Sequence, residues 1–175
     1  MGMRHFSTSR RIAVLGAALL ALASCGGDSA GFGKPRHSEL NCMERAIYFE
    51  ANRSSRDGMV AVGSVVMNRV ASDQFPNSVC GVVGQKNQFA PGVLSRPIDI
   101  GRVPEVRQAA LSVLRGERHP HVANAMFFHT HGYRFPYDNM HYVLVAGGNA
   151  FYEKRRSHLV TQRTPPPPIE QSRFR

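Results

Sequence analysis

Residues 38–53 read SELNCMERAIYFEANR, and the spacing of their apolar side chains predicts an amphipathic helix. The apolar stripe advances by three and four positions through Leu40, Met43 and Ile47. The next step of this stripe falls on Glu50, so the core-facing side ends in an acid. Burial disfavours the charged form of a carboxyl group, and we expect Glu50 to keep a proton near neutral pH, as a general acid requires. A slight rotation of the helix would instead leave Glu50 solvated or paired with Arg53.

A second helix is expected directly afterwards. Ser54 and Ser55 supply an N-cap, and apolar residues then recur at helical spacing. These residues are Met59, Val62, Val65, Val66 and Val70. Gly58 and Gly63 are costly inside a helix, and the valine-rich run would also suit a strand.

The remainder of the central region predicts one more helix and a sheet. Pro104 is a favourable first residue for a helix, and Gly116 a favourable stop. Three short apolar or aromatic segments follow, separated by Gly, Asn, Pro and Asp: residues 125–128, 142–145 and 150–152. They predict a small antiparallel sheet. Helices followed by strands indicate an α+β domain.

The two ends of the chain differ from this central region. Residues 1–24 place arginines before a short apolar run, which predicts an export signal and not a membrane helix. Residues 25–37 are rich in Gly and predict a flexible tether, and residues 157–175 contain four consecutive prolines and predict a disordered tail. A single domain over residues 38–156 is therefore expected.

The end of the predicted signal, Leu22-Ala23-Ser24-Cys25-Gly26, resembles the lipobox of bacterial lipoproteins. The resemblance implies cleavage before Cys25 and acylation of this residue. Several acyl chains anchor a protein stably, so we expect a membrane-anchored lipoprotein that faces the periplasm. Gly26 after the cysteine fits sorting to the outer membrane if the cell is Gram-negative.

The charge of the exported part bears on its partners. Loss of residues 1–24 removes three arginines and no acid, which lowers the formal net charge from +10 to +7. Nucleic acid would be the usual partner of a basic cytoplasmic protein, but export argues against it. We expect a monomer with mild attraction to anionic peptidoglycan and lipid head groups.

Two cysteines remain once Cys25 is set aside as the lipid attachment site. Cys42 and Cys80 form an even pair in an oxidising compartment, where a disulfide is more common than a metal site or a nucleophile. We predict that they are bonded to each other.

An ordered series of motifs resembles the SleB-type cell wall hydrolases, the family of spore cortex-lytic enzymes. The motifs are CMERAIYFEA (42–51), GMVAVG (58–63), VMNRV (66–70), FPNSVCGVV (75–83), QF (88–89), AMFFH (125–129), PY (136–137) and GNAFY (148–152). The resemblance implies a lysozyme-like fold, peptidoglycan as substrate, Glu50 as the catalytic acid and lytic transglycosylase activity. Residues 52–55 and the loop 90–102 depart from the family pattern.

The acidic residues indicate a mechanism with one catalytic carboxyl group. Retaining and inverting glycosidases ordinarily use two. Other acids have weaker cases, since Asp57 suits a helix start and the remainder lie in turns or loops: Asp73, Asp99 and Asp138. A lone Glu50 suits protonation of the bridge between N-acetylmuramic acid and N-acetylglucosamine, followed by attack of the muramyl 6-hydroxyl. Hydrolysis by a positioned water, as in a muramidase, is the alternative.

Candidate substrate-binding residues are polar or aromatic and fall within these motifs. They are Tyr48, Asn68, Gln88, Phe89, Phe128, His129, Tyr137 and Tyr152. Amides and hydroxyls can bond sugar groups, and aromatic faces can cover sugar rings. Phe89 and Phe128 could equally belong to the core, and Asn68 could brace a neighbouring loop.

Two other functions compete with glycan cleavage. Several histidines invite a zinc amidase interpretation, but no H-E-x-x-H motif occurs and we expect neither a metal nor a cofactor. A non-catalytic, peptidoglycan-binding lipoprotein of the same fold is the second alternative. A costly buried acid at Glu50 argues against it.

Overall fold

The computed structural model describes residues 37–51 and 54–172. The predicted export signal, Cys25 and Arg53 lie outside the described residues, as does all but His37 of the predicted tether. The described residues belong to one compact unit, Pro35–Arg175. None of the helices among them has the length and apolar character needed to cross a membrane.

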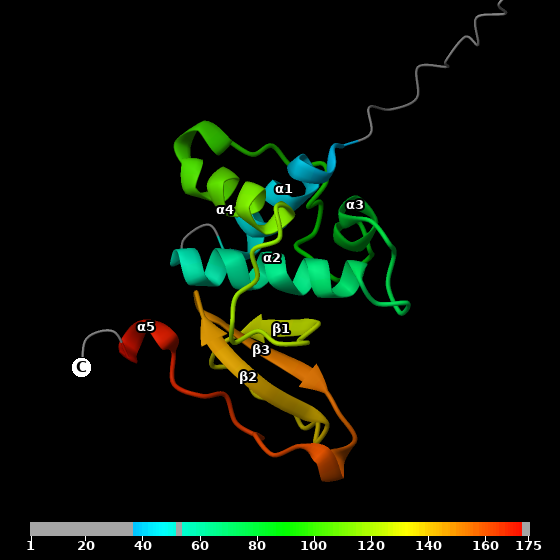
Figure 1. Ribbon diagram of the computed structural model, residues 1–175, viewed down its shortest axis with the longest axis vertical. Helices are drawn as coiled ribbons and strands as arrows, with labels where there is room; N and C mark the ends of the chain where they lie inside the picture. Colours follow the sequence, from blue (N-terminus) through cyan, green and yellow to red (C-terminus); the bar gives the residue numbers. More distant parts are fainter. Residues whose placement is uncertain (1–36, 52–53, 173–175) are drawn as a thin grey trace, which may run out of the picture. The chain divides into compact units, whose positions relative to one another are not determined.

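The main helices precede the strands, as predicted, and two short helices of the described residues come after the strands. The helices are α1 (Glu39–Ala51), α2 (Arg56–Val70), α3 (Val79–Val83), η1 (Ile100–Arg102), α4 (Pro104–Leu114), η2 (Ser157–Leu159) and α5 (Ile169–Ser172), where η denotes a 3-10 helix. The strands are β1 (Phe127–Thr130), β2 (Met140–Ala146) and β3 (Asn149–Lys154). Helix α2 lies between the sheet and a layer formed by α1, α3 and α4 (Figure 1). The α+β class is confirmed.

Helix α2 is the central element of the core, and its sequence explains why. The hydroxyl oxygen of Ser55 accepts a hydrogen bond from the Gly58 amide at 3.2 Å, which caps the helix as predicted. All residues from Gly58 to Val66 are buried. A Cβ atom on Gly58 would lie 2.5 Å from the Gly147 Cα, so this helix glycine permits a close approach of the β2–β3 turn.

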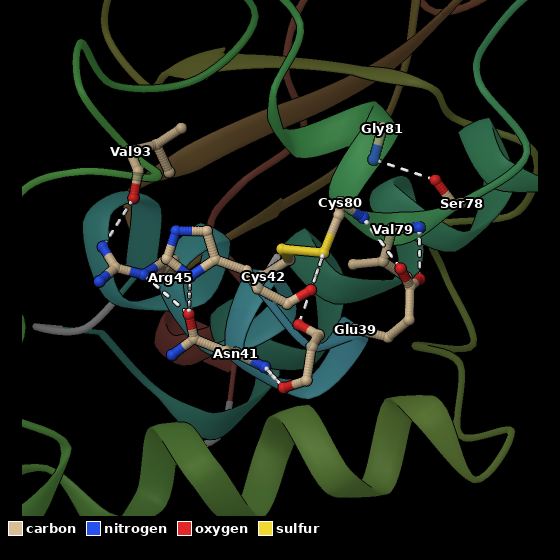
Figure 2. The surroundings of a disulfide bond; sticks show 11 residues. Glu39, Asn41, Cys42, Arg45, Ser78, Val79, Cys80, Gly81 and Val93 are labelled. Atoms are coloured by element: carbon tan, nitrogen blue, oxygen red, sulfur yellow. Dashed lines mark hydrogen bonds between the residues drawn. A yellow bond between two sulfur atoms is a disulfide. The ribbon is translucent and has the colours of Figure 1, made fainter. Parts of the chain in front are cut away.

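The disulfide prediction is confirmed. Cys42 in α1 and Cys80 in α3 are bonded, with their Cα atoms 5.2 Å apart. Glu39 of α1 supports the same junction, because its Oε2 accepts the Val79 amide at 2.6 Å (Figure 2). The short helix α3 is thus held against the first turns of α1 by the disulfide and by hydrogen bonds from the Val79 and Cys80 amides to the Glu39 carboxylate.

Loss of this disulfide is expected to lower the free energy of unfolding by roughly 3 to 4 kcal/mol, because the bond closes a loop of 38 residues in the unfolded chain. Urea denaturation of the variant with Cys42→Ser and Cys80→Ser measures the effect. Wild-type protein in reducing buffer serves as the control and should unfold at the same denaturant concentration as the variant. Coincident curves for the variant and the oxidised wild type would contradict the prediction.

The three strands form an antiparallel sheet in the order β1-β3-β2. Gly147 and Gly148 join β2 to β3, with φ angles of 56° and 77°. Two successive residues with positive φ are what a type I′ hairpin turn requires, and glycine adopts them without strain. The predicted strands are confirmed, although β1 begins two residues later than the sequence indicates.

The C-terminal segment differs from the disordered tail that the sequence predicts. Residues 157–172 run along β2 to α5 (Figure 1), with Val160 buried and Ile169 packed on the main core. Glu170 Oε1 accepts hydrogen bonds from the Ser55 hydroxyl at 2.6 Å and the Gly147 amide at 2.7 Å. The prediction is wrong because composition alone does not reveal tertiary partners such as Ser55, which lies 115 residues before Glu170.

Candidate active site

Glu50 lies in the last turn of α1, with its side chain directed toward the loop that follows α3. Met43 and Ile47, the preceding members of the apolar stripe, are fully buried, whereas Glu50 itself is half-buried. Its Oε1 accepts a hydrogen bond from the Ala90 amide at 2.8 Å. No described residue donates a hydrogen bond to Oε2. One carboxyl oxygen is therefore held in place while the other is available for proton exchange.

Burial is the main influence on the protonation of Glu50. Loss of water around the carboxyl group raises its pKa above the ordinary value of 4.5. The Ala90 amide and the positive charge of Arg69 act in the opposite direction and offset part of this effect. The acid is thus destabilised as a carboxylate, but it has two partners that favour the charged form.

A second contact fixes the end of α1 that carries the acid. The Asn149 side-chain amide donates to the Glu50 carbonyl oxygen at 3.1 Å. Carbonyl groups in the last turn of a helix lack partners within the helix, and Asn149, the first residue of β3, satisfies this one. The sheet and α1 are therefore joined at Glu50.

A cavity of about 490 Å³ is lined by the loop after α3, which donates the Ala90 hydrogen bond to Glu50. Its walls come from residues 84–87 and 89–95, including Ala90 and Phe89. Ala90, one of the lining residues, donates its amide to the Glu50 carboxyl group, whereas Glu50 itself is not part of the lining. The volume is within the range typical of small-ligand sites.

Arg69 is the residue of this site that sequence reasoning missed. It is only 3% exposed and lies over the rings of Phe75, Phe89 and Phe127, at 5.2, 5.4 and 5.8 Å from their centroids. Burial lowers the pKa of Arg69 to about 10, so it remains a cation at neutral pH. Its Nε donates to the Met126 carbonyl oxygen at 2.7 Å, while Nη1 is buried without a hydrogen-bond partner among the described residues. The sequence does contain a signal for the burial of Arg69, because this residue continues the helical spacing of the buried Val62, Val65 and Val66 on α2.

Replacing Arg69 with Met is expected to raise the pKa of Glu50 further, because the variant loses the positive charge that favours the carboxylate. An NMR titration that follows the Glu50 carboxyl carbon measures this pKa directly. Arg69→Lys is the matched control, since it retains the charge and should leave the titration closer to that of the wild type. An Arg69→Met titration that coincides with the wild type would show that the cation does not act on Glu50.

Four predicted site residues form two separate pairs of neighbouring rings. The Phe89 ring lies 6.4 Å from Phe128, and His129 lies 5.8 Å from Tyr152. Burial raises the pKa of the Tyr152 hydroxyl, and the Arg69 cation lowers it in part. Phe89, on the Ala90 loop, and Tyr152, near Arg69, are therefore the predicted aromatic residues that the structure brings toward Glu50.

The other four predicted residues have different surroundings. Asn68 donates to the Ala123 and Ala125 carbonyl oxygens, both at 2.9 Å, and so braces the loop before β1. Tyr48 packs edge-on against Phe49 and lies two residues from Glu50, on another face of α1. Gln88 is exposed on the Ala90 loop, and Tyr137 is 66% exposed in the β1–β2 loop.

The histidines that invited the zinc interpretation have polar contacts of other kinds. His119 is buried within 3.7 Å of Asp57, and His129 Nε2 lies 2.9 Å from the Tyr142 hydroxyl. Over residues 37–51 and 54–172, no three His, Cys, Asp or Glu side chains gather in a way that could hold a metal ion.

Comparison with known proteins places this geometry in a family. The model of the Cell Wall Hydrolase family matches residues 53–152, more than half of the chain, beginning three residues after Glu50. The spore cortex-lytic enzyme of Bacillus subtilis is 31% identical over 80 residues, which cover 46% of this chain and 26% of that protein. The enzyme of Oceanobacillus iheyensis is 32% identical over 79 residues, covering 45% and 28%. The matches thus span little more than a quarter of these relatives.

Solved structures agree with this assignment at the level of the fold. The catalytic domain of the germination-specific lytic transglycosylase SleB from Bacillus anthracis superposes with a TM-score of 0.55 at 24% identity, covering 69% of this chain and 98% of that domain. The Bacillus cereus SleB catalytic domain gives the same TM-score and identity, covering 73% and 100%. The chain therefore has the lysozyme-like fold of SleB catalytic domains and belongs to the Cell Wall Hydrolase family.

Proposed function

We propose that this protein cleaves the glycan strands of peptidoglycan between N-acetylmuramic acid and N-acetylglucosamine, with Glu50 as the proton donor. The observation that carries the proposal is the half-buried Glu50 carboxyl group, whose pKa is raised by burial and whose Oε1 is held by the Ala90 amide. Its hydrogen bond to a loop that lines a cavity, in a chain of the Cell Wall Hydrolase family, supports a catalytic role over a structural one.

The reaction can be derived from the two protonation states of Glu50. In the first step, the protonated carboxyl group donates its proton to the bridging oxygen as the bond between that oxygen and the muramyl C1 breaks. The carboxylate that results is stabilised by the Ala90 amide and the Arg69 charge. It then takes the proton of the muramyl 6-hydroxyl as this oxygen bonds to C1. The product has a 1,6-anhydro end, and Glu50 regains its proton without a net use of water.

The use of a single carboxyl group is part of the proposal. Three other acids of the described residues are paired with arginines: Glu44 with Arg107 at 2.8 Å, Asp99 with Arg102 at 3.0 Å and Glu153 with Arg155 at 2.8 Å. Participation of the substrate's own hydroxyl group supplies the nucleophile that a second acid supplies in ordinary glycosidases. Phe89 and Tyr152 are the best placed of the predicted residues to contact the sugars.

Mass spectrometry of the fragments released from purified peptidoglycan tests this function. We expect soluble muropeptides with 1,6-anhydro ends. Reducing muramyl ends would indicate a muramidase-type hydrolase in place of a transglycosylase. Release of free peptides would indicate an amidase and overturn the proposal. An absence of released fragments, with wall binding retained, would favour the non-catalytic alternative.

We further propose that the protein acts from a membrane to which Cys25 anchors it. Support comes from the lipobox-like sequence and the basic, apolar segment before it. Mass spectrometry of the N-terminal peptide from cells should find acyl groups on Cys25. An unmodified peptide that begins elsewhere would overturn the anchor and leave the enzymatic proposal intact.

A further inference from the structure

A second cavity, of about 410 Å³, lies between the β1–β2 loop and the C-terminal segment. Its walls are residues 131–135 of the loop and 163–165 of the C-terminal segment, and Tyr142 of β2 contributes to the lining. Residues 163–165 lie beyond the part of the chain that the family model matches. This cavity therefore depends in part on a segment that the family model does not match.

Two arginines line this cavity without an acid to neutralise them. Arg163 donates from Nη1 to the Asp138 carbonyl oxygen at 3.3 Å and from Nη2 to the Ser157 carbonyl oxygen at 3.1 Å. These bonds orient the guanidinium group but leave its charge uncompensated. Neither Arg163 nor Arg134 forms an ion pair with any acid of residues 37–51 and 54–172. An anionic ligand is what such a wall favours.

Aromatic rings line the same cavity and remain open to solvent. Tyr133 is 65% exposed and Phe135 is 44% exposed. The Phe135 ring is nonetheless held in place, stacked on Tyr137 at 6.0 Å and edge-on to His129 at 4.9 Å. Ordered aromatic surface beside cations suits a ligand that carries both a negative charge and an apolar portion.

The cavity is connected to the proposed catalytic site through side chains. Tyr142 lies with its ring 5.7 Å from that of Tyr152. Tyr152 is close enough to Arg69 for the guanidinium charge to act on its hydroxyl group, and Arg69 acts in the same way on Glu50. Tyr142, which lines the cavity, is paired with Tyr152 across β2 and β3. A ligand in this cavity would thus lie on the face of the sheet that carries Tyr152.

We propose that this cavity binds the carboxylate groups of the peptidoglycan stem peptide. The identity of the ligand rests on the proposed function, because a glycan strand in the catalytic site presents a peptide on its muramyl residues. Arginine guanidinium groups match carboxylates in a two-pronged geometry, and the exposed rings can cover the aliphatic parts of the peptide. The uncharged N-acetylglucosamine units alone would not use two unpaired cations.

Binding of defined fragments to the full exported chain carrying Glu50→Gln tests the proposal, since this variant leaves the probe uncleaved. The probes are a disaccharide tetrapeptide, the same disaccharide without its peptide, and inorganic phosphate, each measured by isothermal titration calorimetry. We expect the peptide-bearing probe to bind more tightly than the bare disaccharide. Arg163→Gln should weaken its binding about tenfold or more, and Arg134→Gln should do the same.

Controls separate this site from the catalytic one. Arg115→Gln, at an exposed position at the end of α4, is the matched control and should bind as tightly as the parent. If Arg163→Gln fails to fold, Arg134→Gln decides, because the Arg134 side chain makes no hydrogen bond to the described residues. Equal affinity with and without the peptide, or an unchanged affinity in the arginine variants, would overturn the proposal.

Inorganic phosphate distinguishes a peptide site from a site for a phosphorylated lipid head group. Phosphate that binds as tightly as the tetrapeptide probe, with the same loss in Arg163→Gln, would overturn the peptide assignment. The peptide-binding proposal and the catalytic proposal can be overturned independently. Peptide binding could persist in a protein that releases no glycan fragments. Conversely, glycan release that depends on Glu50 could persist where the peptide does not bind.

Discussion

Glu50→Gln is expected to lower the rate of peptidoglycan solubilisation by about 10²- to 10⁴-fold, the range that a general acid or base contributes. The amide has nearly the shape of the carboxyl group and can still accept the Ala90 hydrogen bond through its oxygen. It can neither donate an acidic proton to the glycosidic oxygen nor take one back. Release of soluble muropeptides over time measures the rate, and a rate equal to that of the wild type would exclude Glu50 from the chemistry.

Stability measurements on the same variant distinguish loss of chemistry from loss of structure. The pKa of Glu50 is raised by folding, so its contribution to stability is fully present below pH 4.5 and is lost as the pH rises through the folded-state pKa. Glutamine cannot ionise, and at neutral pH the variant should therefore be at least as stable as the wild type. The difference should shrink toward pH 4.5. A variant that is less stable at neutral pH would indicate that the carboxylate has a structural role.

The elements that the sequence predicted correctly are those defined by local patterns. Helix α1 follows from the spacing of Leu40, Met43 and Ile47, and α2 begins at the serine cap that the sequence contains. The disulfide follows from a count of cysteines and the predicted compartment. In each case the signal lies within one element or in the residue type, and no knowledge of distant neighbours is needed.

The parts that could not be predicted depend on contacts between distant segments. The Ala90 amide reaches Glu50 from a loop 40 residues later, and a backbone donor has no sequence signature. Arg69 has the charge of a surface residue, but three aromatic rings from three other segments surround it. For Asn68 the sequence left substrate binding and loop bracing both open, and only the tertiary contacts show that its amide braces backbone carbonyls. Such roles are set by tertiary packing, which overrides local preference.

Removal of residues 157–175 is expected to lower the free energy of unfolding by about 3 to 6 kcal/mol. The truncated protein loses two hydrogen bonds to the Glu170 carboxylate, each typically worth about 1.5 to 3 kcal/mol. It also exposes core surface that Val160 and Ile169 cover. Urea denaturation of the full-length and truncated proteins measures the difference. Equal stability would restore the prediction of a tail that contributes nothing to the domain.

The same truncation is expected to reduce activity, because the C-terminal segment supports the turn that leads to Asn149. Glu170 holds the Gly147 amide, and Asn149, two residues later, bonds the Glu50 carbonyl oxygen. Glu170→Gln is the matched variant, since it keeps the segment and the side-chain shape but weakens both hydrogen bonds by removing the charge. We expect Glu170→Gln to lose about 1 to 3 kcal/mol of stability and to retain more activity than the truncation. Full activity in the truncated protein, at a temperature where it stays folded, would show that Asn149 and Glu50 are positioned without help from the C-terminal segment.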